Sequence, residues 1–78
     1  MTRIILYSKP NCVYCDKVKN HIKVNEMDNV EFDETANVAE IRKFERMQFP
    51  MLKIIDDEGN EQGLFESEVI IQVLDQLK

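Results

Sequence analysis

The run Arg3-Ile4-Ile5-Leu6-Tyr7 limits the folds open to this chain more than any other segment. Successive side chains of a strand point to opposite faces of a sheet, and this run places apolar residues on both faces. Such a strand is typical of the centre of a sheet that helices cover on both sides. Residues 3–7 therefore predict a central strand, and the rest of the chain must supply its neighbours and its cover.

Apolar residues at helical spacing mark three further stretches, which we interpret as helices. Pro10 and Asn11 supply a turn and an N-cap before the first, Pro50 ends the second, and Ser67 caps the third. The apolar positions are Cys15, Val18 and Ile22 in residues 12–25; Val38, Ile41 and Phe44 in residues 38–47; and Val69, Ile70, Val73, Leu74 and Leu77 after Ser67.

Three short segments predict the other strands. Residues 30–33 alternate as an edge strand with one buried side would, and residues 51–55 and 62–65 flank a polar turn over residues 56–60. The predicted order is β-α-β-α-β-β-α. A right-handed helical crossover makes the first two strands parallel, so we predict an α/β fold with a four-stranded mixed sheet flanked by three helices.

The chain has 78 residues, of which 44% are hydrophobic, and it contains no repeat or linker. This length suits one domain, residues 1–78, whose single core leaves a modest margin of stability. The apolar run near the start is too short for a signal-peptide core, and no stretch reaches membrane-spanning length. We therefore expect a cytoplasmic protein.

The net charge of −5 argues against nucleic-acid binding, which requires a basic face. The charge is unevenly distributed, because residues 1–23 hold five basic residues against one acidic, whereas residues 24–78 hold five basic against fourteen acidic. Each lysine of the first segment is, taken singly, typical of a solvated helix face. Together these lysines set a positive potential that favours a thiolate and an anionic substrate.

The only two cysteines, Cys12 and Cys15, stand between the first predicted strand and the first predicted helix. Residues three apart on a helix have Cα atoms roughly 5–6 Å apart, a distance that a disulfide can bridge. In a reducing compartment such a pair is seldom a structural staple, so it indicates a redox-active or metal-binding site. A closed zinc site needs about four ligands, and His21 lies on another helix face, so we expect His21 to be exposed and without a catalytic role.

Thiol–disulfide exchange requires a thiolate, whereas a free cysteine with a pKa of about 8.5 is mostly protonated at neutral pH. Cys12, at the start of the helix, would receive unpaired N–H groups and the positive end of the helix dipole, and Lys9 can reach the same place. Cys15 lies one turn further on, beside Asp16. We therefore predict that Cys12 is the exposed nucleophile and Cys15 the resolving thiol.

The active-site segment resembles that of the glutaredoxins, the smallest enzymes of the thioredoxin fold. The likeness rests on Tyr7-Ser8-Lys9, on Cys12-Val13-Tyr14-Cys15-Asp16-Lys17-Val18-Lys19, on the order of elements and on Pro50 before the third strand. It extends over essentially the whole chain. Cys-Val-Tyr-Cys is similar in particular to the glutaredoxins of large tailed bacteriophages, which donate electrons to ribonucleotide reductase.

The resemblance implies a monomeric dithiol glutaredoxin that uses glutathione as its co-substrate, has no tightly bound cofactor or metal, and reduces protein disulfides. Ribonucleotide reductase is the candidate protein substrate, and neither nucleic acid nor a membrane is an expected partner. A phage-encoded copy would act in the host cytoplasm. Two rivals stay open: a redoxin of the same fold reduced by thioredoxin reductase, and a module whose cysteines hold a metal or an iron–sulfur cluster between two copies.

The resemblance also implies binding residues, each with a plainer alternative. Lys9 and Arg46 would bind glutathione carboxylates, or are ordinary surface charges. Tyr14 would stack on the substrate, or covers the start of the helix. Pro50 would be a cis-proline that leaves the Phe49 backbone free to pair with a substrate peptide, or is a simple strand opener.

Three positions depart from the family pattern. Gln48-Phe49 replaces the usual Thr-Val before the proline, so the wall of the groove carries a bulky ring. The usual Gly-Gly turn is reduced to Gln62-Gly63, where Gly63 permits close approach of a ligand or serves only a turn at the strand end. The acidic residue that follows this turn in the family corresponds to Glu66 or, less well, to Ser67.

Overall fold

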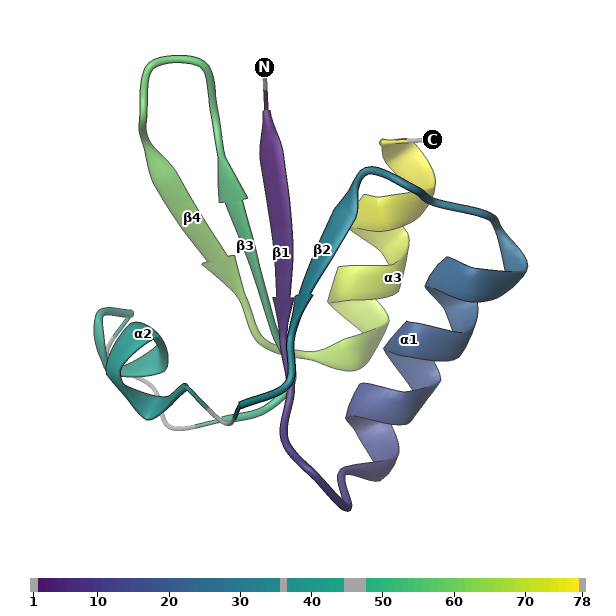
Figure 1. Ribbon diagram of the computed structural model, residues 1–78. Helices are drawn as coiled ribbons and strands as arrows, with labels where there is room; N and C mark the ends of the chain where they lie inside the picture. The colour runs from purple at the N-terminus through teal and green to yellow at the C-terminus, as the bar shows by residue number, and fades with distance from the viewer. Residues whose placement is uncertain (1, 36, 45–47, 78) are drawn as a thin grey trace.

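The computed structural model describes residues 2–35, 37–44 and 48–77. These residues form a sheet of four strands with helices on both of its faces (Figure 1). In chain order the elements are β1 (Arg3–Tyr7), α1 (Val13–Val24), β2 (Val30–Asp33), α2 (Val38–Arg42), β3 (Met51–Ile55), β4 (Glu61–Leu64) and α3 (Ser67–Gln76). The predicted order of elements is confirmed. Of the helices in these residues, none is long and apolar enough to cross a membrane.

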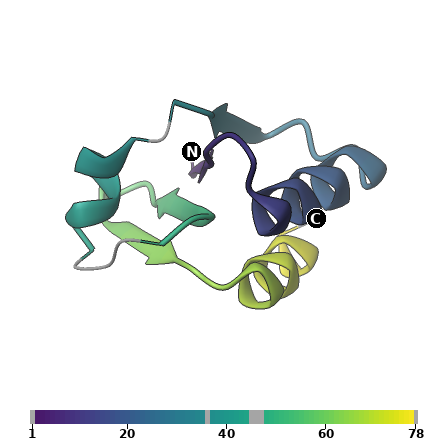
Figure 2. The same cartoon turned by 90° about the horizontal axis from the view of Figure 1, so that it is seen from below.

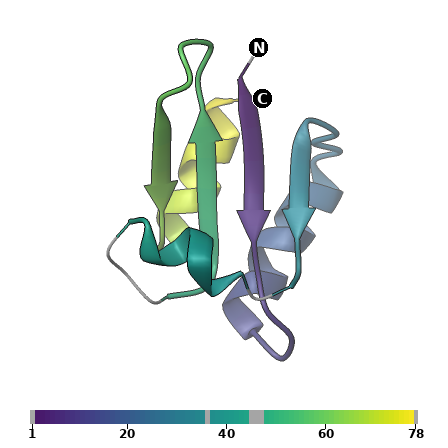
Figure 3. The ribbon, with the colours of Figure 1, turned by 60° about the vertical axis from the view of Figure 1, so that its left-hand side comes forward.

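β1 is a central strand of the sheet, whose order is β2-β1-β3-β4. It runs parallel to β2, with Ile4 opposite Val30, and antiparallel to β3, with Leu6 opposite Leu52. β3 in turn runs antiparallel to β4, and Figure 3 shows the four strands side by side with α2 in front of them. The predicted α/β class with a four-stranded mixed sheet is confirmed, and the arrangement is thioredoxin-like.

Two apolar cores lie on the two faces of the sheet. α1 and α3 pack side by side on one face, and α2 lies on the other (Figure 1, Figure 2). The core under α1 and α3 consists of Ile4, Leu6, Val18, Ile22, Met27, Val30, Leu52, Ile70 and Leu74. The core under α2 consists of Ile5, Tyr7, Ile41, Met51 and Phe65. Alternate residues of β1 thus enter opposite cores, as its two-sided apolar run predicts.

The predicted bounds agree with the observed ones more closely for the strands than for the helices. β1, β2 and β3 have their predicted bounds, and β4 lies one residue earlier than residues 62–65. α2 ends at Arg42 instead of continuing to residue 47. The N–H groups of Lys43 and Phe44 bond to carbonyls only three residues back, on Glu40 and Ile41, and a tight turn of this kind ends an α-helix. Residues 45–47 lie outside the described part of the chain.

Some apolar residues that the pattern predicted to be buried are exposed. On α3, Ile70 and Leu74 are buried, whereas Val69 and Leu77 are 38% and 40% exposed. The helix packs along one side against α1 and the sheet, so its buried stripe is narrower than the predicted one. Phe32 is 45% exposed because β2 is an edge strand whose outer flank faces solvent.

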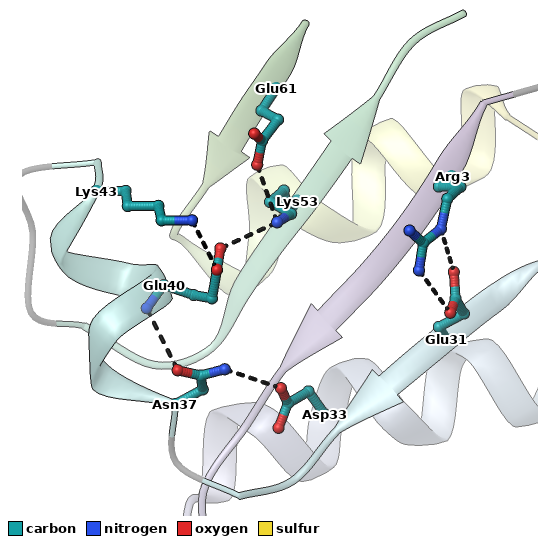
Figure 4. Close-up of polar contacts among 8 residues, drawn as sticks. All are labelled: Arg3, Glu31, Asp33, Asn37, Glu40, Lys43, Lys53 and Glu61. Carbon is teal, nitrogen blue, oxygen red and sulfur yellow. Dashed lines mark hydrogen bonds and ion pairs between the residues drawn. The ribbon is translucent and has the colours of Figure 1, made fainter. Parts of the chain in front are cut away.

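A buried lysine fastens the short helix α2 to the sheet (Figure 4). Lys53 on β3 is 7% exposed, and its Nζ lies 3.0 Å from Oε2 of Glu40 on α2 and 2.9 Å from Oε1 of Glu61 on β4. The ammonium also lies 5.6 Å from the ring centroid of Tyr7. Burial by itself lowers the pKa of Lys53, but hydrogen bonds to Glu61 and Glu40 outweigh it and raise the pKa above its ordinary value. Lys53 is therefore a permanent cation beneath α2.

Polar contacts also hold the loop that leads into α2 (Figure 4). Asn37 is the N-cap of α2, where its Oδ1 accepts the backbone N–H of Glu40 at 3.4 Å. Its Nδ2 donates to Oδ2 of Asp33 at 3.2 Å, which joins this cap to the end of β2. The start of α2 is thus tied to the edge of the sheet, as its middle is tied by Lys53.

We expect Glu40→Gln to lower the free energy of unfolding by about 1 kcal/mol at neutral pH, because Lys53 loses one of its two carboxylate partners. Hydrogen bonds from Lys43 and then from Lys53 lower the pKa of Glu40. A carboxyl group with a lowered pKa stabilises the folded state above its unfolded pKa of about 4.3, and that contribution is lost as the pH falls through the folded value.

Urea unfolding between pH 7 and pH 3 should therefore reveal a smaller loss of stability on acidification in Glu40→Gln than in the wild type. Glu58→Gln, in the exposed turn between β3 and β4, is the matched control and should behave as the wild type. An equal acid loss in Glu40→Gln and the wild type would contradict the role given to this carboxylate.

Candidate redox-active site

The loop that follows β1 carries the cysteine pair into α1. Cys12 occupies the N-cap of α1, with φ −112° and ψ 106°, and its Sγ accepts the backbone N–H of Cys15 at 3.2 Å. The Cα atoms of the two cysteines are 5.2 Å apart, and their sulfurs form a disulfide. The prediction that the pair can close at a strand-to-helix junction is confirmed.

The N-cap of α1 is Cys12 and not Asn11. Asn11 has a φ of +59°, in the left-handed region that asparagine tolerates better than most residues. An N-cap residue needs extended backbone angles, and Cys12 is the residue that has them. The predicted cap was thus wrong by one residue, and the correction places the Cys12 sulfur at the helix N-terminus itself.

Cys12 is the more accessible of the two cysteines, but it is less exposed than predicted. Its exposed fraction in the disulfide form is 7%, against 0% for Cys15. Because the S–S bond ties it to a fully buried partner, the Cys12 sulfur is held against the helix. Val13 and Tyr14, between the cysteines, are 78% and 64% exposed, so two large side chains extend into solvent beside the pair.

The start of α1 favours negative charge on the Cys12 sulfur. N–H groups in the first turn of a helix have no carbonyl partner within that helix, and the helix dipole is positive there. The N–H of Cys15 already points at the Cys12 sulfur, and the carbonyl of Cys12 accepts the N–H of Asp16 at 3.0 Å. After reduction the same N–H can be donated to a thiolate, which supports the assignment of Cys12 as the nucleophile.

The segment before β3 forms the second part of the site. The Phe49–Pro50 peptide bond is cis, the form that the resemblance implied, and Pro50 is fully buried. Pro50 directly precedes Met51, which pairs with Tyr7 at the end of β1. Lys9 Nζ lies 5.8 Å from the ring centroid of Phe49, within the range of a cation–π contact. The structure thus gathers three predicted residues, Lys9, Phe49 and Pro50, at the end of β1 that leads to the cysteines.

Gly63 has a packing role within β4. It lies opposite Lys53, and a Cβ added to it would stand 2.9 Å from the ring of Phe44. The close approach that glycine permits is therefore made by this ring, which follows α2. The turn interpretation is wrong, because Gly63 lies inside the strand.

Glu66 lies at the start of α3, at the same edge of the sheet as the cysteine loop. β1 and β4 both run antiparallel to β3, so their carboxyl ends point the same way (Figure 1). Glu66 is exposed and occupies the N-cap position without a side-chain capping bond, whereas Ser67 is the first helical residue. The predicted Ser67 cap is wrong, because the extended backbone angles that a cap requires belong to Glu66. Arg46 lies outside the described residues.

Val13 is a feature of the site that sequence reasoning missed. The sequence does mark it, because Val13 is an apolar residue between the cysteines that lies outside the buried stripe of Cys15, Val18 and Ile22.

His21 was predicted to be exposed but is half-buried, and its Nε2 lies 2.8 Å from Oδ1 of Asp75 on α3. Within residues 2–35, 37–44 and 48–77, no group of three or more His, Cys, Asp or Glu residues is arranged to hold a metal ion.

Comparison with known proteins supports the fold and adds nothing about the substrate. No family model matches the chain, and no curated protein sequence matches it. A solved structure described as "Structure of a malarial protein" superposes with a TM-score of 0.59 over 97% of this chain and 96% of that chain, at 12% sequence identity. At that identity the likeness is one of fold alone. The chain is thus a thioredoxin-like α/β protein with a disulfide-forming cysteine pair, an arrangement that is typical of thiol–disulfide redox proteins.

We expect Gly63→Ala to destabilise the protein by about 1–3 kcal/mol, the usual cost of overpacking, because the new methyl group meets the Phe44 ring. The double variant Gly63→Ala, Phe44→Leu should lose less than the sum of the two single variants. Urea unfolding of the four proteins measures this coupling. Additive losses would mean that Phe44 is not the neighbour that excludes a side chain here.

We expect the Cys12 thiol of the reduced protein to ionise well below pH 8.5, because its sulfur lies at the helix N-terminus and accepts the N–H of Cys15. The pH dependence of iodoacetamide alkylation in Cys15→Ser measures this ionisation, and Cys12→Ser gives the matched value for Cys15. A lower pKa for Cys15 than for Cys12 would reverse the roles assigned to the two sulfurs.

Proposed function

We propose that this protein is a dithiol glutaredoxin, a glutathione-dependent oxidoreductase that reduces protein disulfides. One observation carries the proposal: Cys12 stands at the N-cap of α1, accepts the N–H of Cys15, and is bonded to a fully buried Cys15. From this arrangement we expect an acidic Cys12 sulfur, the more accessible of the two, with a second sulfur behind it. Both are requirements of a dithiol exchange mechanism.

The proposed cycle begins with attack of the Cys12 thiolate on a substrate disulfide. A Cys12–substrate disulfide forms, and the substrate's other sulfur leaves as a thiolate that takes a proton from water. The Cys15 thiolate then attacks the Cys12 sulfur, which closes the Cys12–Cys15 disulfide and releases the second substrate thiol. Two electrons have passed from the pair to the substrate, and two molecules of glutathione return them and leave as glutathione disulfide.

The surroundings of Cys12 suit an anionic ligand with an extended backbone. Lys9 offers an ammonium group above the Phe49 ring, and the Phe49–Pro50 peptide bond is cis. We expect the Phe49 ring to line one side of the ligand groove. Glutathione carries two carboxylates and peptide groups that could pair with a backbone edge beside this proline. Tyr14, at 64% exposure, is free of the core, which supports a role in covering a bound ligand.

The deciding experiment compares two sources of electrons for reduction of a small disulfide. We expect turnover with glutathione, glutathione reductase and NADPH, and little with thioredoxin reductase and NADPH. Cys12→Ser should abolish turnover. Cys15→Ser should lose protein-disulfide reduction, because the mixed disulfide can no longer be resolved from within. Turnover with thioredoxin reductase alone would assign the protein to the rival redoxin class.

The proposed protein substrate is ribonucleotide reductase, and the support for it is the likeness of Cys-Val-Tyr-Cys to the phage glutaredoxins. Trapping with Cys15→Ser tests it, because the mixed disulfide between Cys12 and its protein substrate then persists. Analysis of the purified protein for metal and for mass tests the rival module with a metal or iron–sulfur cluster between two copies. Stoichiometric metal with negligible thiol exchange would overturn the enzyme proposal.

A further inference from the structure

Ser8 is a fully buried polar residue at the edge of the site. It directly follows β1 and has an exposed fraction of 0%. Its N–H donates to the carbonyl of Asp33 at 2.8 Å, which continues the hydrogen-bond ladder between β1 and β2 by one residue. Its hydroxyl oxygen makes no hydrogen bond in the part of the chain that the structure describes. A buried hydroxyl without a partner is costly, so its retention requires a reason.

The alternation of β1 places the Ser8 side chain on the face of the sheet that α1 covers. Ile4 and Leu6 point into the core under α1 and α3, whereas Ile5 and Tyr7 point into the core under α2. Because the ladder continues through Ser8, its side chain follows Ile4 and Leu6. The hydroxyl therefore points to the face of the sheet that α1 covers. At this end of β1 the chain crosses to the first turn of α1 (Figure 2).

Cys15 occupies the same buried layer. Cys15 and Val18 are the first two buried residues of α1, and both have an exposed fraction of 0%. Val18 belongs to the same core as Leu6, so the inner face of α1 at this level packs on the side of β1 to which Ser8 points. A buried hydroxyl donor and a buried sulfur thus both lie between the sheet and α1, on the same face of the sheet.

We propose that Ser8 is a positioning residue for the cysteine pair, whose hydroxyl donates a hydrogen bond to the Cys15 sulfur once the disulfide has been reduced. This inference rests on the redox function proposed above. Reduction breaks the S–S bond and places two electrons on the sulfurs, which become thiols or thiolates as protons are taken up from solvent. In the disulfide, by contrast, the Cys15 sulfur is a weak acceptor, and the hydroxyl has no partner.

The Cys12 and Cys15 sulfurs differ in the hydrogen-bond donors that the helix backbone provides. The Cys12 sulfur already has a donor in the N–H of Cys15. The Cys15 sulfur is fully buried, and among the described residues no backbone N–H donates to it, so its donor must come from a side chain. Ser8 fills that need in the reduced protein only. It therefore stabilises the dithiol relative to the disulfide, which raises the reduction potential of the pair.

The test measures the equilibrium between the dithiol and the disulfide in a dithiothreitol redox buffer, for the wild type, Ser8→Ala and Ser8→Thr. We expect Ser8→Ala to favour the disulfide by about five- to tenfold, which corresponds to a potential about 20–30 mV more negative at 29.6 mV per tenfold change. Ser8→Thr keeps the hydroxyl and should stay within about twofold of the wild type.

Val30→Ala is the matched control. Val30 lies on β2 and belongs to the core under α1 and α3, but it pairs with Ile4, at the end of β1 away from the cysteines. It should lower the stability of the oxidised and reduced proteins equally and leave the equilibrium unchanged, whereas Ser8→Ala should destabilise the reduced protein more. The proposal is overturned if Ser8→Ala stays within about twofold of the wild type, or if Val30→Ala shifts the equilibrium as far. Since no enzyme turnover enters this measurement, failure of glutathione-dependent activity would be recognised separately.

Discussion

Burial of β1 on both faces is the constraint on which the rest of the structure depends. Ile4 and Leu6 enter one core and Ile5 and Tyr7 enter the other, while β2 and β3 occupy its two edges. A strand held on two faces and two edges has no freedom to shift its register, because a slip by one residue would exchange the two sets of side chains. Its carboxyl end is therefore a fixed point, and residues 8–12 lead from that point directly to α1.

The directions of the other strands determine which segments meet at the candidate site. β3 is antiparallel to β1, so the beginning of β3 lies beside the end of β1 and brings Pro50 next to the loop that carries Cys12. β4 is parallel to β1, so the start of α3 with Glu66 reaches the same edge of the sheet. Segments that are distant in sequence thus meet because of strand direction. Lys53, which lies under α2, fixes that helix above the sheet through its ion pairs with Glu40 and Glu61.

The sequence predicts those parts of the structure that depend on local pattern. The pattern of apolar residues in a strand is set by which of its faces are buried, so the bounds of the strands could be predicted to within one residue. The N-cap at Cys12 could not, because the preferred capping residue, Asn11, adopts left-handed backbone angles that only the folded loop reveals. The contact of Gly63 with Phe44 joins β4 to the segment after α2, and the exposure of Leu77 reflects where α3 leaves its neighbours. Contacts between distant segments leave no periodic signal in a single sequence.

The positive charge of the first segment divides into a structural part and a part that acts at the site. Lys19 has 19% of its side chain exposed and lies 2.6 Å from a carboxylate oxygen of Glu34, so its charge is neutralised while it ties α1 to the segment after β2. Lys9 lies above the ring of Phe49, and a ring attracts an ammonium group without cancelling its charge. The potential at Cys12 therefore depends on the loop and on the helix start, more than on the basic segment as a whole. A dipole acts within one turn of its end, so its attraction for negative charge is confined to the immediate surroundings of that sulfur.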